Sequence, residues 1–214
     1  MYVSETPLII GNAREEFAVL AEMADGRYDF RNQKKLGAFS MLLADQPDPS
    51  IGHMQRRQVA EAMNSIHTKI RTALPLARLH ASTVYKSTLE RNQTHVEETR
   101  HWHTDYIGNH TSFVIGSDVL DLVTTSAVGC IEDESAIVDL TIPRQDYIVE
   151  QLKLKNLTIW RPGAGDLALM SPTTLHQATL HDSDEAVVRV LHHTRLISAY
   201  PQHVWPAHLG NQAA

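Results

Sequence analysis

The sequence predicts a mainly β protein in which a helical N-terminal layer covers an antiparallel sandwich or jelly-roll core. Two observations predict this fold class. Before Pro75 the apolar residues recur at spacings of three and four, which is typical of amphipathic helices. Beyond Pro75 seven or eight short segments rich in β-branched residues alternate with turn-forming residues, as in an all-β sandwich or barrel.

Two helices are expected in the first third of the chain. Asn12 is placed to cap the first, with Glu15 three residues on as in a capping box and Gly26 as the stop. The second follows Ser50 and ends at Pro75, because proline cannot continue a helix. Its apolar stripe consists of Val59, Met63, Ile66, Ile70 and Leu74.

The strands are expected after Pro75, and nothing in the sequence marks a domain boundary. A single domain, 1–214, is therefore expected, with a helical layer at 1–77, a β core at 78–200 and a tail at 201–214. Residues 144–155 fit either a short helix or another strand. The expected strands are 79–88, 111–117, 120–130, 135–142, 156–160, 166–171 and 185–199.

Composition limits the classes of function. The net charge of -6 argues against a broad nucleic-acid interface, because phosphate binding needs clustered basic residues. No segment approaches the roughly 18 apolar residues of a membrane span, and the N-terminus does not resemble a signal peptide. With Cys130 as the only cysteine, a reducing, cytoplasmic location is expected. The oligomeric state cannot be read from the sequence.

The stretch HWHTDY, residues 101–106, places His101, His103 and Asp105 on alternate positions. In an extended segment these side chains share one side, where they form either a solvated polar face or most of a metal site. A second His from a distant strand would complete a 2-His-1-carboxylate triad, which leaves positions on iron(II) open. His176 is such a residue, since it follows a Gly-Asp turn, an apolar strand and a second turn.

These features together resemble the iron(II)/2-oxoglutarate-dependent dioxygenases. That family has a double-stranded β-helix, a His-x-Asp pair, a Gly-Asp turn before an apolar strand, a distal His, and an Arg about ten to fifteen residues further on. Here the pair is His103 and Asp105, the distal His is His176, and the Arg is Arg189, 13 residues later. The resemblance covers residues 79–197 and leaves the N-terminal third unassigned.

The resemblance implies a double-stranded β-helix core and an iron(II) site made by His103, Asp105 and His176. It also implies that 2-oxoglutarate and molecular oxygen are co-substrates and that the reaction oxidises an unactivated C–H bond. The acidic, compact chain with few aromatic residues favours a small-molecule substrate, such as an amino acid or a biosynthetic intermediate, with a peptidyl residue as the alternative. Either Arg189 or Arg195, which lies six residues on along the same strand face, would bind the far carboxylate of 2-oxoglutarate. Tyr85, Lys86 and Thr88 are expected to point inward from the first barrel strand and to contact co-substrate or substrate.

Other interpretations remain open at this stage. A metal-binding cupin also uses a jelly roll, but the Glu that should follow the His-x-His is missing. A zinc hydrolase is disfavoured because no HExxH motif is present. A non-catalytic β-barrel domain is the remaining alternative. In it His103 and His176 are ordinary polar residues, and Arg189 pairs with a protein carboxylate such as Asp182 or Glu185.

Overall fold

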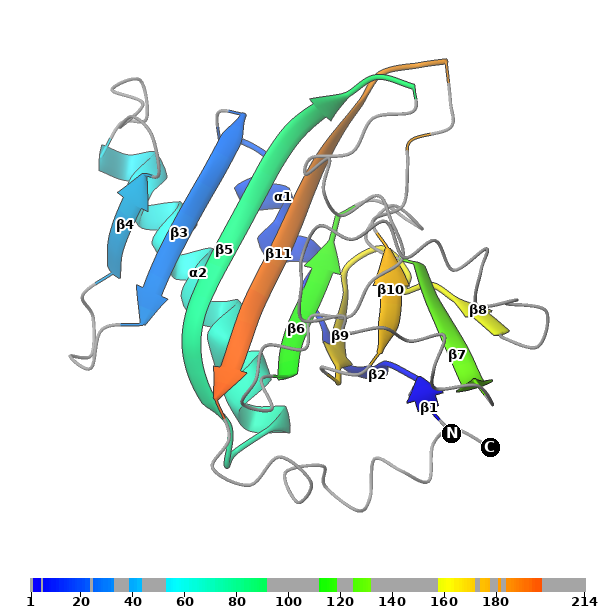
Figure 1. Ribbon diagram of the computed structural model, residues 1–214. Helices are drawn as coiled ribbons and strands as arrows, with labels where there is room; N and C mark the ends of the chain where they lie inside the picture. The colour runs from blue at the N-terminus through cyan, green and yellow to red at the C-terminus, as the bar shows by residue number, and fades with distance from the viewer. Residues whose placement is uncertain are drawn as a thin grey trace.

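The computed structural model describes residues 2–4, 6–23, 25–32, 39–43, 53–91, 112–118, 125–131, 158–171, 174–177, 181 and 184–197. These residues form a mainly antiparallel β structure with two helices, arranged as a large sheet, a smaller sheet and a helical layer (Figure 1). The β-rich character predicted from the sequence is thereby confirmed. The winding of the strands into a double-stranded β-helix stays a prediction.

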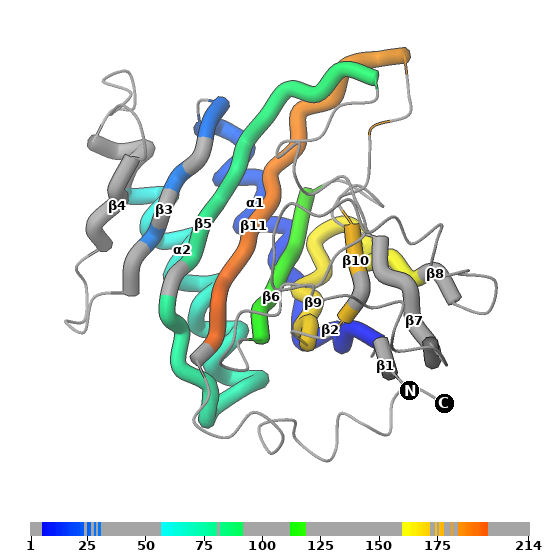
Figure 2. Tube along the Cα trace, in the orientation of Figure 1, coloured from blue at the N-terminus to red at the C-terminus, as the bar shows by residue number. Residues whose placement is uncertain are grey.

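The large sheet has seven strands in the order β2-β9-β6-β11-β5-β3-β4, and all its pairings are antiparallel. Its centre is the long pair of β5 and β11, which run side by side in Figure 2. A register shift interrupts this pair between Arg195 and Leu196. The strands are β2 (Leu8–Asn12), β9 (Asp166–Met170), β6 (Ser112–Ser117), β11 (Val187–Ile197), β5 (Arg78–Leu89), β3 (Gly26–Asn32) and β4 (Phe39–Leu43).

The smaller sheet is organised around β7 (Thr125–Ile131), which pairs with the other three strands. These are β1 (Tyr2–Ser4), β8 (Thr158–Trp160) and β10 (Leu175–Gln177). The three-residue strand β10, which carries His176, was not predicted from the sequence. So short a segment shows no period of its own, and it becomes a strand only through its pairing with β7.

Helices α1 (Arg14–Leu20) and α2 (His53–Ala73) cover one face of the large sheet (Figure 1). The stripe predicted for the second helix is confirmed, since every member is at most 5% exposed. Val84, Val114 and Val190 of the sheet belong to the same buried cluster as this stripe. No helix among the described residues combines the length and the hydropathy that crossing a membrane requires.

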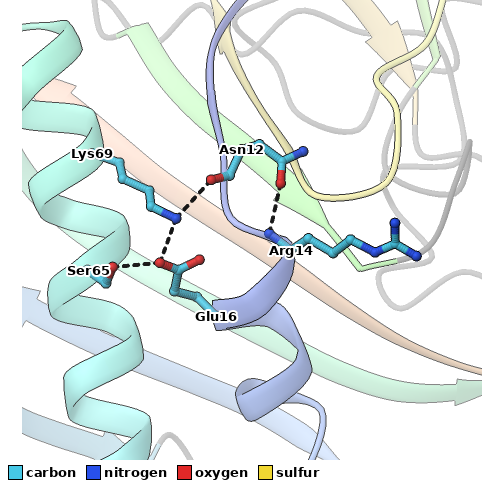
Figure 3. Close-up of polar contacts among 5 residues, drawn as sticks. All are labelled: Asn12, Arg14, Glu16, Ser65 and Lys69. Atoms are coloured by element: carbon cyan, nitrogen blue, oxygen red, sulfur yellow. Dashed lines mark hydrogen bonds and ion pairs between the residues drawn. The ribbon is translucent and has the colours of Figure 1, made fainter.

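A polar cluster joins the two helices (Figure 3). Glu16 on α1 is only 8% exposed, and its Oε1 accepts hydrogen bonds from Ser65 Oγ (2.5 Å) and Lys69 Nζ (2.6 Å). Lys69 Nζ also donates to the backbone carbonyl of Asn12 (2.9 Å). Burial by itself raises the pKa of Glu16, but the bonds from Lys69 and Ser65 outweigh it and the pKa is lowered. Glu16 therefore stays ionised and ties α1 to α2.

The first helix differs from its prediction. It runs only from Arg14 to Leu20, its N-cap is Ala13, and Gly26 begins β3 instead of ending the helix. The side chain of Asn12 accepts the Arg14 N–H (3.1 Å), one position earlier than a capping box requires. The cause is tertiary, because the Ala13 N–H donates to the Gly165 carbonyl (2.7 Å) and so fixes where the helix starts.

The helical layer predicted for residues 1–77 needs a larger correction. Four strands, β1 to β4, lie within the first 43 residues and pair with strands from the rest of the chain or with each other. Most of these strands are short and lie at or near sheet edges, so their pairing partners, rather than a local pattern, make them strands. The proposed division into 1–77, 78–200 and 201–214 stays a prediction.

Most of the strands predicted beyond Pro75 are confirmed. The segment 79–88 lies within β5, and the segments 111–117, 156–160, 166–171 and 185–199 contain β6, β8, β9 and β11. The C-terminal part of 120–130 lies in β7. The segments 135–142 and 144–155 and the tail 201–214 lie outside the described residues.

Candidate functional site

The large sheet presents its second face to the smaller sheet, and we call this the inner face. Its buried apolar residues form one cluster with partly buried Tyr85 and with Trp160 of β8 in the smaller sheet. Tyr85 therefore points inward, as predicted, although its contact with a co-substrate stays a prediction. Alternation along β5 places Lys86 and Thr88 on the other face with Val84, contrary to the prediction, and Lys86 Nζ donates to the Met23 carbonyl. The buried members of the cluster are Phe113, Ile115, Ala168, Met170 and Leu191.

Strand β11 alternates strictly between the two faces. Leu191 belongs to the inner cluster, whereas Val190 and Leu196 belong to the cluster under the helices. Alternation along the strand then places Arg189, His193 and Arg195 on the inner face with Leu191. The sequence-based expectation that these residues share one side is therefore consistent with the burial of their neighbours.

His176 lies between the two sheets. It is 6% exposed, and its ring centroid lies 5.5 Å from that of Phe113 on the large sheet. Its Nδ1 lies 2.9 Å from the Thr174 carbonyl oxygen. A carbonyl can only accept, so Nδ1–H is the donor, and the tautomer with this hydrogen has its lone pair on Nε2. Metal-binding histidines are commonly oriented by this kind of bond to a backbone carbonyl.

Among the described residues, Arg189 is the largest fully buried side chain, with 1% exposure. Burial lowers its pKa to about 10, while the negative charge of Asp118 acts in the opposite direction. The guanidinium therefore remains charged at neutral pH. A buried cation is expensive without an anion close by, so this position is suited to a carboxylate.

Asp118 is a carboxylate that the sequence analysis did not consider. It directly follows β6, and its Oδ1 accepts from the Val190 N–H (2.8 Å) and from Ser117 Oγ (3.2 Å). The pKa of Asp118 is raised, because the effect of burial exceeds the lowering by these hydrogen bonds and by the charge of Arg189. No local pattern predicts this contact, because the register between β6 and β11 brings Asp118 beside Arg189.

His193 and Arg195 lie nearer the other end of β11. The His193 ring is 4.9 Å from Phe113, so Phe113 contacts one imidazole from each sheet. Arg195 is exposed and lies directly opposite Phe113 in the β6–β11 register. Six residues of extended strand separate Arg189 from Arg195, which is about 20 Å. The two arginines are therefore too far apart to hold the same carboxylate.

The Gly-Asp turn has a structural role. Gly165 has φ +83°, its N–H donates to the Ser117 carbonyl (2.6 Å), and a Cβ added there would lie 2.7 Å from Arg14 Cβ. Asp166 accepts from the Gly163 N–H (2.9 Å) and from Asn12 Nδ2 (3.2 Å). This turn joins the ends of β2, β6 and β9, and so fixes the strand that precedes His176.

The other two predicted metal ligands, His103 and Asp105, lie outside the described residues, as does His101. Within the part of the chain that the structure describes, no three His, Cys, Asp or Glu side chains come together as a metal site. The triad of His103, Asp105 and His176 therefore stays a prediction.

A chain of buried polar groups lies on the opposite face of the large sheet, under the helices. His67 Nε2 lies 2.7 Å from Ser82 Oγ, which lies 2.5 Å from Thr194 Oγ1, which lies 2.8 Å from His192 Nε2. Burial, with a smaller effect of Arg71, lowers the pKa of His67 to about 4. Burial also holds the pKa of His192 well below its ordinary value. In the sequence His67 and His192 both stand among apolar residues, and this pattern could have indicated that they are buried.

Comparisons with known proteins give structural similarity only. No protein-family model matches the chain, and no curated protein matches its sequence. The non-heme α-ketoglutarate-dependent carbocyclase SnoK from nogalamycin biosynthesis matches over 68% of this chain and 62% of SnoK, less than two thirds of its length, at 14% identity and TM-score 0.45. Apo HygX from Streptomyces hygroscopicus matches over 92% of this chain and 83% of HygX, at 10% identity and TM-score 0.48.

A third solved structure, apo ThoJ, is described as a non-heme monooxygenase. It matches over 90% of this chain and 73% of ThoJ, at 12% identity and TM-score 0.49. All three identities are below 15% and all three TM-scores are below 0.5.

Proposed function

We propose that this protein is an iron(II)- and 2-oxoglutarate-dependent dioxygenase that oxidises an unactivated C–H bond of a small molecule. In this proposal the two sheets form a double-stranded β-helix, and His103, Asp105 and His176 hold the metal. The observation that carries the proposal is the setting of His176. It is buried between the sheets, and the Thr174 carbonyl holds its ring in the tautomer that a metal ligand needs.

The residue types proposed for the site fit the chemistry of the cofactors. Two neutral imidazoles and one carboxylate suit iron(II), and a buried guanidinium suits the far carboxylate of 2-oxoglutarate. Iron(II) together with 2-oxoglutarate would supply the activation of molecular oxygen. We assign the co-substrate carboxylate to Arg189, because it is 1% exposed whereas Arg195 is exposed to solvent.

The chain's own residues have distinct tasks in this proposal. Thr174 orients the His176 ring, and Asp118 balances the charge of Arg189 until an acid binds. Arg189 then pairs with that acid in a bidentate, charge-assisted contact, which lysine would make less well. Phe113 and Leu191, both buried, exclude water from the space between these groups.

The test measures the binding of iron(II) and 2-oxoglutarate under anaerobic conditions, with calorimetry and visible absorption as the readouts. We expect His176→Ala and Asp105→Ala to lose iron. Arg189→Gln should keep iron but bind 2-oxoglutarate at least about thirtyfold more weakly, because a buried charged partner is lost. His181→Gln is the matched control, since His181 is as buried (4%) but donates to the Glu185 carbonyl (2.5 Å).

The expected consequence is succinate release when iron, 2-oxoglutarate, oxygen and a suitable small molecule are present. A folded wild-type protein that binds neither iron nor 2-oxoglutarate would refute the proposal. If the His176 and Asp105 variants changed only the free energy of unfolding, the non-catalytic or cupin-like β-barrel domain would be the better interpretation.

A further inference from the structure

Arg195 is a cation for which the described side chains of the sheet and of the helical layer supply no counter-charge. Its side chain is exposed on the inner face, and none of the described residues forms a hydrogen bond or an ion pair with it. The neighbouring positions on that face carry no acid either, because Arg195 lies opposite Phe113 on β6 and Ala81 on β5. Among the described positions next to it, Arg195 is therefore the group that carries a charge.

At the other end of β11, on the same inner face, the charge of Arg189 is already balanced. Asp118 lies beside Arg189, and the proposed function assigns the far carboxylate of 2-oxoglutarate to Arg189. About 20 Å of strand separates the two arginines, so a single five-carbon diacid held by Arg189 leaves Arg195 available. A protein with net charge -6 that binds a small anion needs such a local cation.

The residues around Arg195 indicate which other chemical groups a ligand bound there would carry. Phe113, directly opposite, is packed against the rings of His176 and His193. Beyond it lie the buried side chains of Ile115 and Leu191. A guanidinium beside an aromatic and apolar surface is suited to a carboxylate attached to a flat or apolar body.

We propose that Arg195 binds a carboxylate of the primary substrate, which is therefore a small organic acid whose apolar part lies against Phe113. This assignment rests on the proposed function, because it takes the space beside His176 as the place where substrate is oxidised. It makes Arg195 a residue that determines substrate specificity.

The probe is benzoate, with benzamide as a neutral molecule of the same shape, and binding to the metal-free protein is measured by calorimetry. We expect benzoate to bind at least about tenfold more tightly than benzamide, because only benzoate forms the charge-assisted contact. Arg195→Gln should weaken benzoate about tenfold and leave benzamide unchanged. Arg57→Gln, which removes an exposed arginine of α2 on the other side of the sheet, should change neither.

Equal affinity for the two probes, no binding of benzoate, or unchanged benzoate affinity in Arg195→Gln would each overturn the proposal. So would a loss of benzoate binding in Arg189→Gln alone.

A parallel titration with 2-oxoglutarate separates this proposal from the proposed function. Arg195→Gln should bind 2-oxoglutarate in the presence of iron(II) as the wild type does. If it does not, Arg195 is the co-substrate arginine and the substrate assignment is wrong. If the wild type ignores 2-oxoglutarate but benzoate binding depends on Arg195, the proposed oxygenase fails and the carboxylate subsite stands.

Discussion

The buried chain between His67 and His192 predicts that acid destabilises the fold in a defined pH window. His67 is 1% exposed, and burial lowers its pKa to about 4, whereas a histidine in an unfolded chain has a pKa of about 6.5. The unfolded chain therefore takes up a proton at this residue before the folded protein does. The free energy of unfolding should fall from about pH 6.5 to about pH 4, and this contribution is complete below that range.

The magnitude follows from the difference between the two pKa values. A pKa difference of about 2.5 corresponds to roughly 3 kcal/mol of unfolding free energy, because each pKa unit is worth about 1.36 kcal/mol. This is a large part of the stability of a typical domain. His192 acts in the same direction, because burial lowers its pKa too. The loss at pH 4 should therefore be at least as large as the value for His67 alone.

The assay is urea unfolding at pH 7, 6, 5 and 4 for the wild type and for His67→Gln. Glutamine keeps an N–H that can donate to Ser82 Oγ but does not titrate. We expect this variant to lose about 3 kcal/mol less than the wild type between pH 7 and pH 4. The difference between the two pH values is the measure, so a constant cost of the substitution does not affect it.

His80→Gln, an exposed position on β5, is the control and should leave the pH dependence as it is in the wild type. If His67→Gln and the wild type lost the same free energy between pH 7 and pH 4, burial of a neutral His67 would not be the cause of acid sensitivity.

Two further substitutions test how the layers are joined, each by urea unfolding at pH 7. Gly165→Ala should cost at least about 2 kcal/mol, because φ is +83° and the added Cβ would lie 2.7 Å from Arg14 Cβ. Gly11→Ala, whose Cβ would meet nothing closer than 3.9 Å, should change little, and equal costs would contradict this account. Lys69→Met should cost about 1–2 kcal/mol, because the ionised Glu16 loses its cation. Adding Glu16→Gln should recover part of that cost, and a double variant no more stable than the single one would refute the ion pair's role.

Several features of the site could be predicted from local sequence. The spacing of three and four between Val59 and Leu74 identified the buried side of α2, because the period of a helix does not depend on its partners. The period of two along β11 likewise placed Arg189 and Arg195 on one side. The Gly-Asp turn was recognisable, since only glycine readily adopts the positive φ found at Gly165.

Other features depend on contacts between distant segments. Asp118 reaches Arg189 only through the register of β6 with β11, and α1 starts where it does because Gly165 binds Ala13. The same holds for β1 to β4, which no local pattern indicates and which become strands through their pairing. His67 and His192 meet through Ser82 and Thr194, which come from two strands far apart along the chain.

The sequence by itself determined which residues share a side of each helix and strand, and therefore which residues are candidates for the site. Only the tertiary structure decided which side faces the helices and which faces the second sheet, and which charged groups meet there. The physical reason is that periodicity is a property of a single segment. Burial, pairing register and the anion beside a buried arginine depend on segments that are far apart in the chain.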